Sequence, residues 1–214
     1  MTLYLDSALA EDARRAAALG FVRGATTNPH LIAAAGVPAT EAVAALCDIL
    51  PGTVFHQLAG ADPAARAVEA LAMLALRPGR VGLKIPCTLD GLALAAELSA
   101  EGHVVGITAV FDAAQVALAC EAGAHYVLPY VNRSTRLMGD GPGMVRRMRA
   151  VADALDAPLQ IIAASVKTPH EAVATLLAGA HHLTLPLAVI EAMARHPLSA
   201  AAIEDFRSAA TAAG

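Results

Sequence analysis

Short apolar runs alternate with Ala-rich amphipathic stretches from one end of the chain to the other. The short runs are rich in β-branched and aliphatic residues and predict buried strands, because four to six apolar residues are too few for a helix. These predicted strands are Leu3–Asp6, Phe21–Gly24, Thr53–Gln57, Gly82–Ile85, His103–Ile107, Tyr126–Pro129, Leu159–Ala163 and Leu183–Leu185. The stretches between and after them predict helices over Ala8–Leu19, Ala39–Leu50, Pro63–Leu76, Leu89–Ala100, Ala113–Ala122, Gly143–Leu155, Pro169–Ala178, Leu187–Arg195 and Ser199–Ala212.

Local chemistry marks several helix ends. Asp62 before Pro63, and Thr168 before Pro169, place a capping side chain ahead of a proline at the first helical position. Glycines after the fifth and seventh helices (Gly123 and Gly179) predict left-handed C-terminal caps.

Eight strand–helix units within about 210 residues indicate a closed parallel (β/α)8 TIM barrel of the α/β class, with an extra C-terminal helix. An open doubly wound sheet is the alternative fold, although no Gly-rich dinucleotide fingerprint follows any predicted strand. Because we find no linker, low-complexity segment or charge run, we expect one domain over residues 1–214.

Composition narrows the classes of function. The formal charge of −4 comes without a basic block, which argues against a nucleic-acid partner and leaves small phosphorylated molecules open. The three cysteines are widely spaced and predict neither a disulfide framework nor a metal site: Cys47, Cys87 and Cys120. The N-terminus lacks a secretory pattern, and charged residues interrupt the apolar stretches before about 18 residues accumulate. We therefore expect a cytoplasmic protein that does not enter a membrane.

Lys84 stands inside the apolar strand Gly82–Ile85, where a lysine is unusual. Burial would lower its pKa, and a neutral amine can attack a ketone to form a Schiff base. Taken alone, this window favours a plainer interpretation, in which the ammonium reaches solvent from a strand end.

Polar residues follow seven of the eight predicted strands, at the end where barrel enzymes carry their chemistry. Each could be a cap, a turn or a loop residue by itself, but together they surround Lys84. In chain order they are Asp6, Thr26 with Thr27 and Asn28, Gln57, Lys84, Thr108, Tyr130 with Asn132 and Arg133, and Ser165 with Lys167.

Several motifs together resemble the small class I aldolase and transaldolase family, and within it the fructose-6-phosphate aldolases. The resemblance covers nearly the whole chain. It rests on Leu3-Tyr4-Leu5-Asp6, Thr26-Thr27-Asn28-Pro29, Lys84-Ile85-Pro86 with Thr88 and Asp90-Gly91-Leu92, Thr108-Ala109-Val110 with Ala113-Ala114-Gln115, Pro129-Tyr130-Val131-Asn132-Arg133, Ala163-Ala164-Ser165 with Lys167-Thr168, and Thr184-Leu185-Pro186-Leu187.

The resemblance implies a catalytic set of five residues. Lys84 would form the imine with the C2 ketone of a sugar, while Gln57, Thr108 and Tyr130 would hold a water for proton transfer. Asp6 would bind donor hydroxyls and assist the proton transfer. Neither a metal nor an organic cofactor is implied.

The resemblance also implies a substrate-binding set. Asn28 would bind donor hydroxyls beside Asp6, and Thr26 would shape that corner. Arg133, Ser165 and Lys167 would bind a phosphate.

Gln57 together with Tyr130 resembles the aldolase members, whereas transaldolases usually carry Glu and Phe at those positions. The expected activity is therefore reversible cleavage of fructose 6-phosphate to dihydroxyacetone and glyceraldehyde 3-phosphate, or addition of dihydroxyacetone-like donors to aldehydes. A transaldolase and a non-catalytic sugar-phosphate-binding barrel remain the alternatives. The family resemblance further implies a homo-oligomer, a pentamer or decamer, with the C-terminal helix packed on a neighbour.

Some residues depart from the family pattern. Leu128 replaces a small residue and could narrow the pocket, Phe111 replaces a tyrosine, and Ser134–Gly141 is a loop of distinct sequence. Strand alternation should turn His56 away from the barrel interior. The pair His181-His182 raises the question of a metal site, but adjacent strand residues point to opposite faces.

Overall fold

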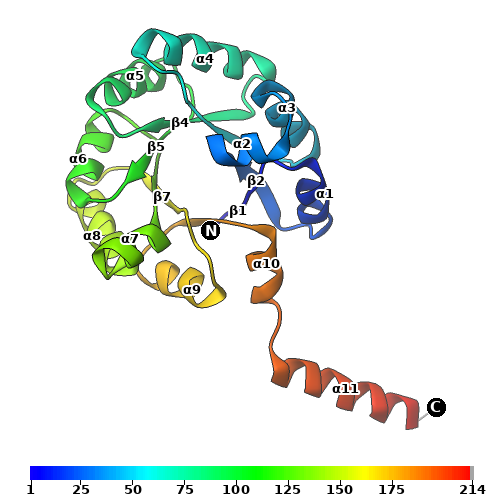
Figure 1. The fold of residues 1–214 in the computed structure, drawn as a ribbon. Helices are drawn as coiled ribbons and strands as arrows, with labels where there is room; N and C mark the ends of the chain where they lie inside the picture. The colour runs from blue at the N-terminus through cyan, green and yellow to red at the C-terminus, as the bar shows by residue number, and fades with distance from the viewer. Residues whose placement is uncertain (213–214) are drawn as a thin grey trace.

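Eight parallel strands close into a barrel in strict chain order, β1 to β8, in a computed structural model that describes residues 1–212 (Figure 1). The strands are β1 (Leu3–Asp6), β2 (Val22–Thr26), β3 (Val54–Gln57), β4 (Val81–Pro86), β5 (Val105–Val110), β6 (Tyr126–Pro129), β7 (Gln160–Ala163) and β8 (His182–Leu185). The predicted TIM barrel is confirmed. The open sheet is excluded, because β8 pairs with β1.

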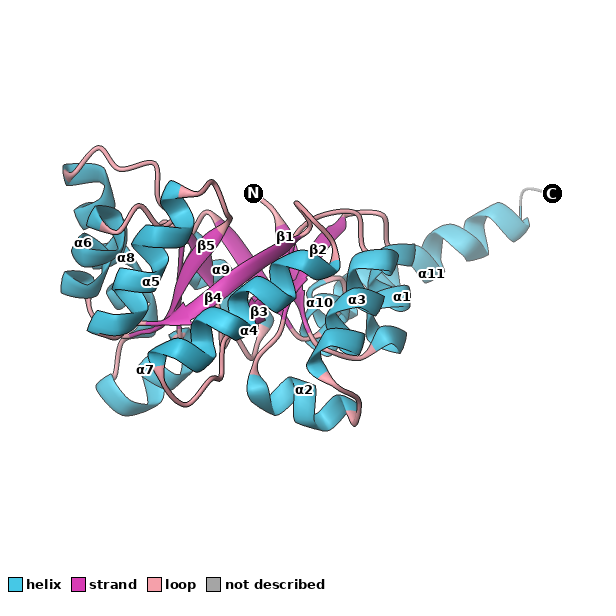
Figure 2. Cartoon of the chain, turned by 90° about the horizontal axis from the view of Figure 1, so that it is seen from above, coloured by secondary structure: helices cyan, strands magenta, loops and turns pink. Residues whose placement is uncertain are grey.

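Helices surround this barrel and separate its strands from solvent (Figure 2). They are α1 (Ala10–Ala18), α2 (Pro29–Ala35), α3 (Ala39–Ile49), α4 (Pro63–Leu76), α5 (Leu89–Ala100), α6 (Ala113–Glu121), α7 (Val131–Met138), α8 (Gly141–Ala154), α9 (Pro169–Leu177), α10 (Leu187–Met193) and α11 (Pro197–Ala212). Two of them, α2 and α7, lie outside the predicted helices. The prediction of a loop over Ser134–Gly141 is therefore wrong for most of its length.

The predicted caps are present. The side chains of Asp62 and Thr168 accept the backbone N–H groups of Ala65 and Glu171. Gly123 and Gly179 have φ angles of 64° and 106°, in the left-handed region that only glycine enters without strain.

Strand alternation divides the apolar residues into two layers. Outward-facing residues such as Leu83 and Ile85 pack beneath the helices, and inward-facing Tyr4, Phe55 and Leu128 fill the barrel. Glycines admit these large inward side chains. A Cβ on Gly82 would lie 2.7 Å from the Phe55 ring.

The histidine pair lies on β8 and in the turn before it, where its imidazoles serve structural hydrogen bonds. His181 accepts the backbone N–H of Ile161 at 2.9 Å and contacts Arg149 at the same distance. His182 accepts the backbone N–H of Thr2 at 2.9 Å and contacts Gln160 at 2.7 Å. His181 therefore joins β7 to α8, and His182 joins β8 to β7 and to the segment before β1.

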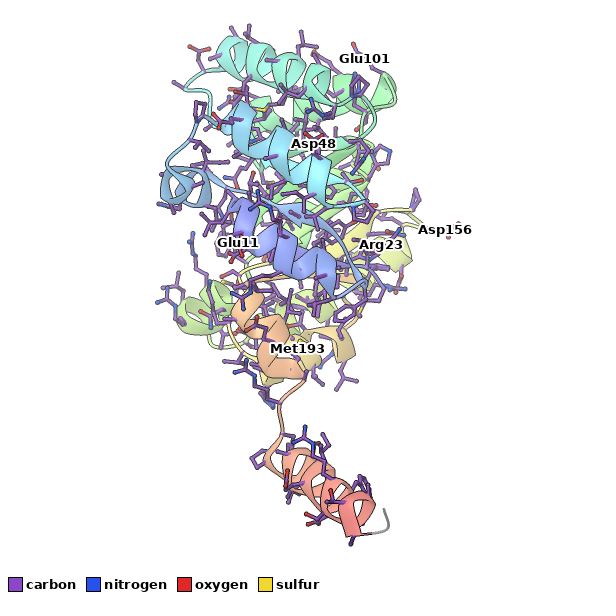
Figure 3. The ribbon with its side chains drawn as sticks, turned by 90° about the vertical axis from the view of Figure 1, so that its right-hand side faces the viewer. Glu11, Arg23, Asp48, Glu101, Asp156 and Met193 are labelled. Carbon is purple, nitrogen blue, oxygen red and sulfur yellow. The ribbon has the colours of Figure 1, made fainter. Side chains whose placement is uncertain are left out.

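Helix α11, at the C-terminal end of the chain, projects away from the barrel (Figures 1 and 3). Over residues 197–212 no side chain is buried, and Leu198 and Phe206 are more than 70% exposed. Within residues 1–212 no single helix is long and apolar enough to cross a bilayer, whereas one bent pair, α2 with α3, satisfies that test by length and composition. The predicted oligomer stays a prediction.

Candidate active site

A cavity of about 360 Å³ opens at the carboxyl ends of the strands. Residues at or just after the carboxyl ends of seven strands, β1 to β7, form its wall. The lining residues are Asp6, Asn28, Pro29, His30, Gln57, Lys84, Ala109, Tyr130, Arg133, Ala164, Ser165 and Lys167. Eight of the ten residues predicted for catalysis or binding thus meet in one cavity, and the other two, Thr26 and Thr108, lie fully buried.

Lys84 lies in the barrel interior and is only 2% exposed. Its neighbours Leu83 and Ile85 pack outward beneath the helices, so alternation along β4 directs the lysine inward. The backbone is held there too, because the Leu58 N–H donates to the Lys84 carbonyl oxygen at 2.9 Å. The interpretation of Lys84 as a solvent-reaching residue is therefore wrong.

Burial lowers the pKa of Lys84 from 10.5 to about 8, against the opposing effect of the Asp6 charge. The amine donates a hydrogen bond to the Thr27 carbonyl oxygen at 2.8 Å. Thr27 is itself fixed, since its N–H and its hydroxyl both donate to the Phe55 carbonyl oxygen. Lys84 is thus a positioned amine with an appreciable neutral fraction near neutral pH.

Asp6 faces the same cavity from the end of β1. Burial raises its pKa, while the charge of Lys84 and a hydrogen bond from Thr26 act in the opposite direction. The Thr26 hydroxyl donates to the carboxylate at 3.0 Å and lies 2.6 Å from the Thr184 hydroxyl. Because Thr26 donates to Asp6, Thr184 must donate to Thr26, which orients the whole chain of groups toward the carboxylate.

No role is predicted for Thr184 from the sequence, because a threonine in the middle of a short apolar strand looks like a core residue. Its inward direction on β8, opposite Thr26, is visible only once the barrel is closed. Thr26 likewise lies beneath the cavity wall and reaches the site through Asp6.

Tyr130, Gln57 and Thr108 form a polar triangle on the opposite side of the cavity. The Tyr130 hydroxyl lies 3.4 Å from the Thr108 hydroxyl and 3.5 Å from the Gln57 side-chain oxygen. Both distances exceed those of ordinary O–H···O hydrogen bonds. The ring of Phe111 packs edge-on against Tyr130, with 5.6 Å between centroids, and fixes the tyrosine from the side.

Asn28 combines a structural task with a place in the wall. Its side-chain oxygen accepts the backbone N–H of Leu31 at 3.1 Å and caps α2. The amide NH2 is therefore the group that Asn28 can offer to a ligand.

The basic residues of the site come from α7 and from the segment after β7. Arg133 stacks its guanidinium over the Tyr130 ring, 4.9 Å from the centroid, while Lys167 and Ser165 lie on the loop between β7 and α9. Guanidinium, ammonium and hydroxyl groups together can bind a phosphate.

Two lining residues have strained backbones. Ala109 and Ser165 have φ angles of 57° and 58°, which residues other than glycine rarely adopt. At Ala109 the pairing of β5 with β6 shifts register, so Thr108 points inward and Val110 packs outward. Strain of this kind concentrates at functional sites.

Leu128 does not narrow the cavity wall as expected. It is fully buried and packs with Tyr4, Phe55 and Ile162 in the barrel interior, below the lining residues. Conversely, His30 lines the cavity without having been predicted. It follows Asn28-Pro29 on the first turn of α2, and recognising that helix in the sequence would have placed it at the rim.

The comparisons agree with this geometry. A sequence model described as transaldolase/fructose-6-phosphate aldolase matches residues 3–213. The chain is 37% identical over 206 residues to a probable transaldolase of Desulforudis audaxviator, covering 96% of this chain and 95% of that protein. It is 35% identical to probable transaldolases of Phenylobacterium zucineum and Thermus thermophilus, covering 96% of this chain in each case and 94% and 96% of those proteins.

A solved structure of a mandelate oxidase variant shares the fold alone. It superposes with a TM-score of 0.60 at 14% sequence identity, covering 86% of this chain and 65% of the other. The match along the sequence, by contrast, extends over the whole barrel and includes every residue of the cavity. The chain therefore belongs to the transaldolase/fructose-6-phosphate aldolase family.

Proposed function

We propose that the protein is a Schiff-base aldolase that reversibly cleaves fructose 6-phosphate to dihydroxyacetone and glyceraldehyde 3-phosphate. The observation that carries the proposal is the buried amine of Lys84, whose pKa burial lowers to about 8, facing a polar cavity. A neutral amine attacks the C2 ketone, and loss of water gives the imine.

Protonation of that imine makes it an electron sink. The C4 hydroxyl gives up its proton, the electrons of the C3–C4 bond move toward the imine nitrogen, and glyceraldehyde 3-phosphate leaves as the aldehyde. The enamine that remains on Lys84 takes a proton at C3, and water then hydrolyses the imine to release dihydroxyacetone.

Tyr130 is the residue best placed to handle these protons. The Tyr130 hydroxyl stands too far from the Thr108 hydroxyl and from the Gln57 side-chain oxygen for strong direct hydrogen bonds, yet close enough to share a water with them. In this proposal, a water held by the three groups accepts the C4 hydroxyl proton and later returns a proton to the enamine.

The remaining polar groups bind the two ends of the sugar. Asp6 and Asn28 take the donor hydroxyls next to Lys84, with Thr26 and Thr184 orienting the carboxylate. Arg133, Ser165 and Lys167 take the phosphate at the rim.

A transaldolase that carries the dihydroxyacetone unit to an aldose phosphate is the second candidate, and the names of the curated relatives favour it. The pairing of Gln57 with Tyr130 favours the lyase. An amide supplies no carboxylate base, which leaves proton transfer to the tyrosine and its water.

Product analysis separates these functions. The wild-type protein is incubated with fructose 6-phosphate alone and, separately, with erythrose 4-phosphate added as an acceptor; Lys84→Arg is the control. Free dihydroxyacetone without an acceptor supports the aldolase. Turnover that requires the acceptor supports the transaldolase, and binding without either product supports the non-catalytic barrel.

A further inference from the structure

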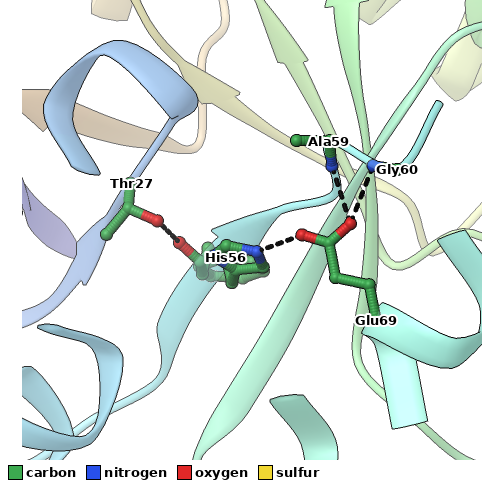
Figure 4. A network of polar contacts seen from close by, with 6 residues as sticks. Thr27, His56, Ala59, Gly60 and Glu69 are labelled. Carbon is green, nitrogen blue, oxygen red and sulfur yellow. Dashed lines mark hydrogen bonds and ion pairs between the residues drawn. The ribbon is translucent and has the colours of Figure 1, made fainter. Parts of the chain in front are cut away.

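The carboxylate of Glu69, on α4, lies behind the cavity wall and contacts the chain at two places. One oxygen lies 2.8 Å from Nε2 of His56, at the end of β3. The other accepts the backbone N–H groups of Ala59 and Gly60, each at 2.9 Å (Figure 4). A single side chain thus joins a strand end to the loop that leaves it.

The two contacts bracket Gln57. His56 and Gln57 point to opposite faces of β3, so the histidine reaches α4 while the glutamine reaches the cavity. Ala59 and Gly60 follow two and three residues later. The backbone that carries Gln57 is consequently anchored on both sides by Glu69.

The charge state of the pair is defined by its surroundings. Burial lowers the pKa of His56, whose side chain is 4% exposed. Although burial alone raises it, hydrogen bonds from His56, Ala59 and Gly60 hold the pKa of Glu69 below its ordinary value. A carboxylate only accepts hydrogen bonds, so the neutral imidazole carries its proton on Nε2.

We propose that Glu69 is a positioning residue for the reaction: through His56 and the backbone of Ala59 and Gly60, it sets the orientation of Gln57 toward the Tyr130 hydroxyl. This inference rests on the proposed function. Its consequence is that Glu69 acts more strongly on proton transfer, which needs the Gln57 side chain, than on imine formation, because Lys84 is also held by the pairing of β4 with Gly106 of β5.

An apolar contact between β3 and α4 would lack the direction that these hydrogen bonds have. The His56 side chain is 4% exposed and that of Glu69 is 22% exposed, so the pair is only partly buried. His56 also keeps Nδ1 buried without a hydrogen-bond partner among the described residues, which is a cost. What the pair supplies beyond an apolar contact is a fixed direction for β3 and its loop.

In the Glu69→Ala variant, imine formation and proton transfer are measured separately. Imine formation is measured by borohydride trapping with dihydroxyacetone, and proton transfer by the exchange of dihydroxyacetone C–H protons into heavy water. We expect trapping close to the wild-type level and exchange slowed by about 10- to 100-fold, the effect of misplacing a reacting group by roughly 1 Å.

Two further variants sharpen the result. Glu69→Gln should keep most of the exchange, because its amide oxygen can accept the two backbone N–H groups and its NH2 can donate to His56 in the other tautomer. The control is Asp48→Ala, which removes the carboxylate bound to Arg77 at the C-terminal end of α4 and should leave both steps unchanged. Asp48 lies on α3 (Figure 3) and is not among the residues that line the cavity.

Should Glu69→Ala fail to fold, the same two measurements are made on His56→Leu. This variant removes the hydrogen bond that anchors β3 before Gln57, while leucine fills the space of the imidazole. Exchange at the wild-type rate, or equal losses of trapping and exchange, would overturn the inference alone. A wild-type protein that traps no imine would overturn the proposed function and this inference with it.

Discussion

Replacing Lys84 by methionine should remove a specific pH dependence from the stability of the protein. In the folded protein, burial lowers the pKa of this lysine to about 8, whereas the unfolded chain has the ordinary value of 10.5. Between these values the unfolded chain holds a proton that the folded protein has released. The free energy of unfolding therefore rises with pH across this window.

The magnitude follows from the two pKa values. Their difference corresponds, at about 1.4 kcal/mol for each pH unit, to about 3 kcal/mol gained between pH 8 and 10.5. Lys84 is 2% exposed, so solvent does not screen the effect. Methionine is similar in length to lysine and has no proton to release. The Lys84→Met variant should therefore lack this rise in the free energy of unfolding with pH.

Urea unfolding at a series of pH values measures this gain in the free energy of unfolding. The protein concentration is kept fixed, because association changes the apparent stability. The wild-type curve minus the Lys84→Met curve cancels the tyrosine and cysteine groups that titrate in both. A difference curve that is flat between pH 8 and 10.5, or that falls, would refute the claim that burial depresses the pKa of Lys84.

Three other predictions concern the cavity and the core. Tyr130→Phe should lower kcat for cleavage by about 100-fold or more while imine trapping on Lys84 persists; full turnover would contradict the proton-transfer role. Arg133→Ala should raise KM by about 10- to 100-fold for phosphorylated substrates and leave unphosphorylated aldehydes unaffected, and equal effects on both would exclude a phosphate site. Gly82→Ala places a Cβ 2.7 Å from the Phe55 ring and should cost about 1–3 kcal/mol, seen as a Tm lowered by several degrees; an unchanged Tm would show that the barrel interior is loosely packed.

The barrel could be predicted because its strands are short, apolar and separated by helices with clear caps. The site followed from the same regularity, since the carboxyl ends of all parallel strands meet at one face. Lys84, Asp6 and Gln57 lie at or near the carboxyl ends of their strands and line the cavity. No single window located them; the recurrence of polar residues after seven predicted strands did.

The two missed helices lack that regularity. Helix α7 begins Val-Asn-Arg-Ser-Thr and has no long apolar stripe. Its Ser134 and Thr135 hydroxyls donate to the carbonyl oxygens of Tyr130 and Val131, and residues of this kind favour turns and caps in a sequence-based prediction. Helix α2 is only seven residues long and ends at Gly36, so its alanines blend with the following helix.

Contacts between residues far apart in the chain could not be predicted from the sequence, for a different reason. Thr184 and Thr26 are 158 residues apart, and only closure of the barrel brings their hydroxyls within 2.6 Å. Likewise, the carboxylate of Glu69 meets the β3–α4 loop only because α4 folds back along β3.

The proposed reaction requires Lys84 to carry the reacting carbonyl as an imine. Reduction with borohydride in the presence of dihydroxyacetone or fructose 6-phosphate, followed by peptide mapping, detects that imine. We predict a stable adduct on the peptide that contains Lys84, absent from Lys84→Arg. An adduct on Lys167, or no adduct at all on the folded wild-type protein, would contradict it.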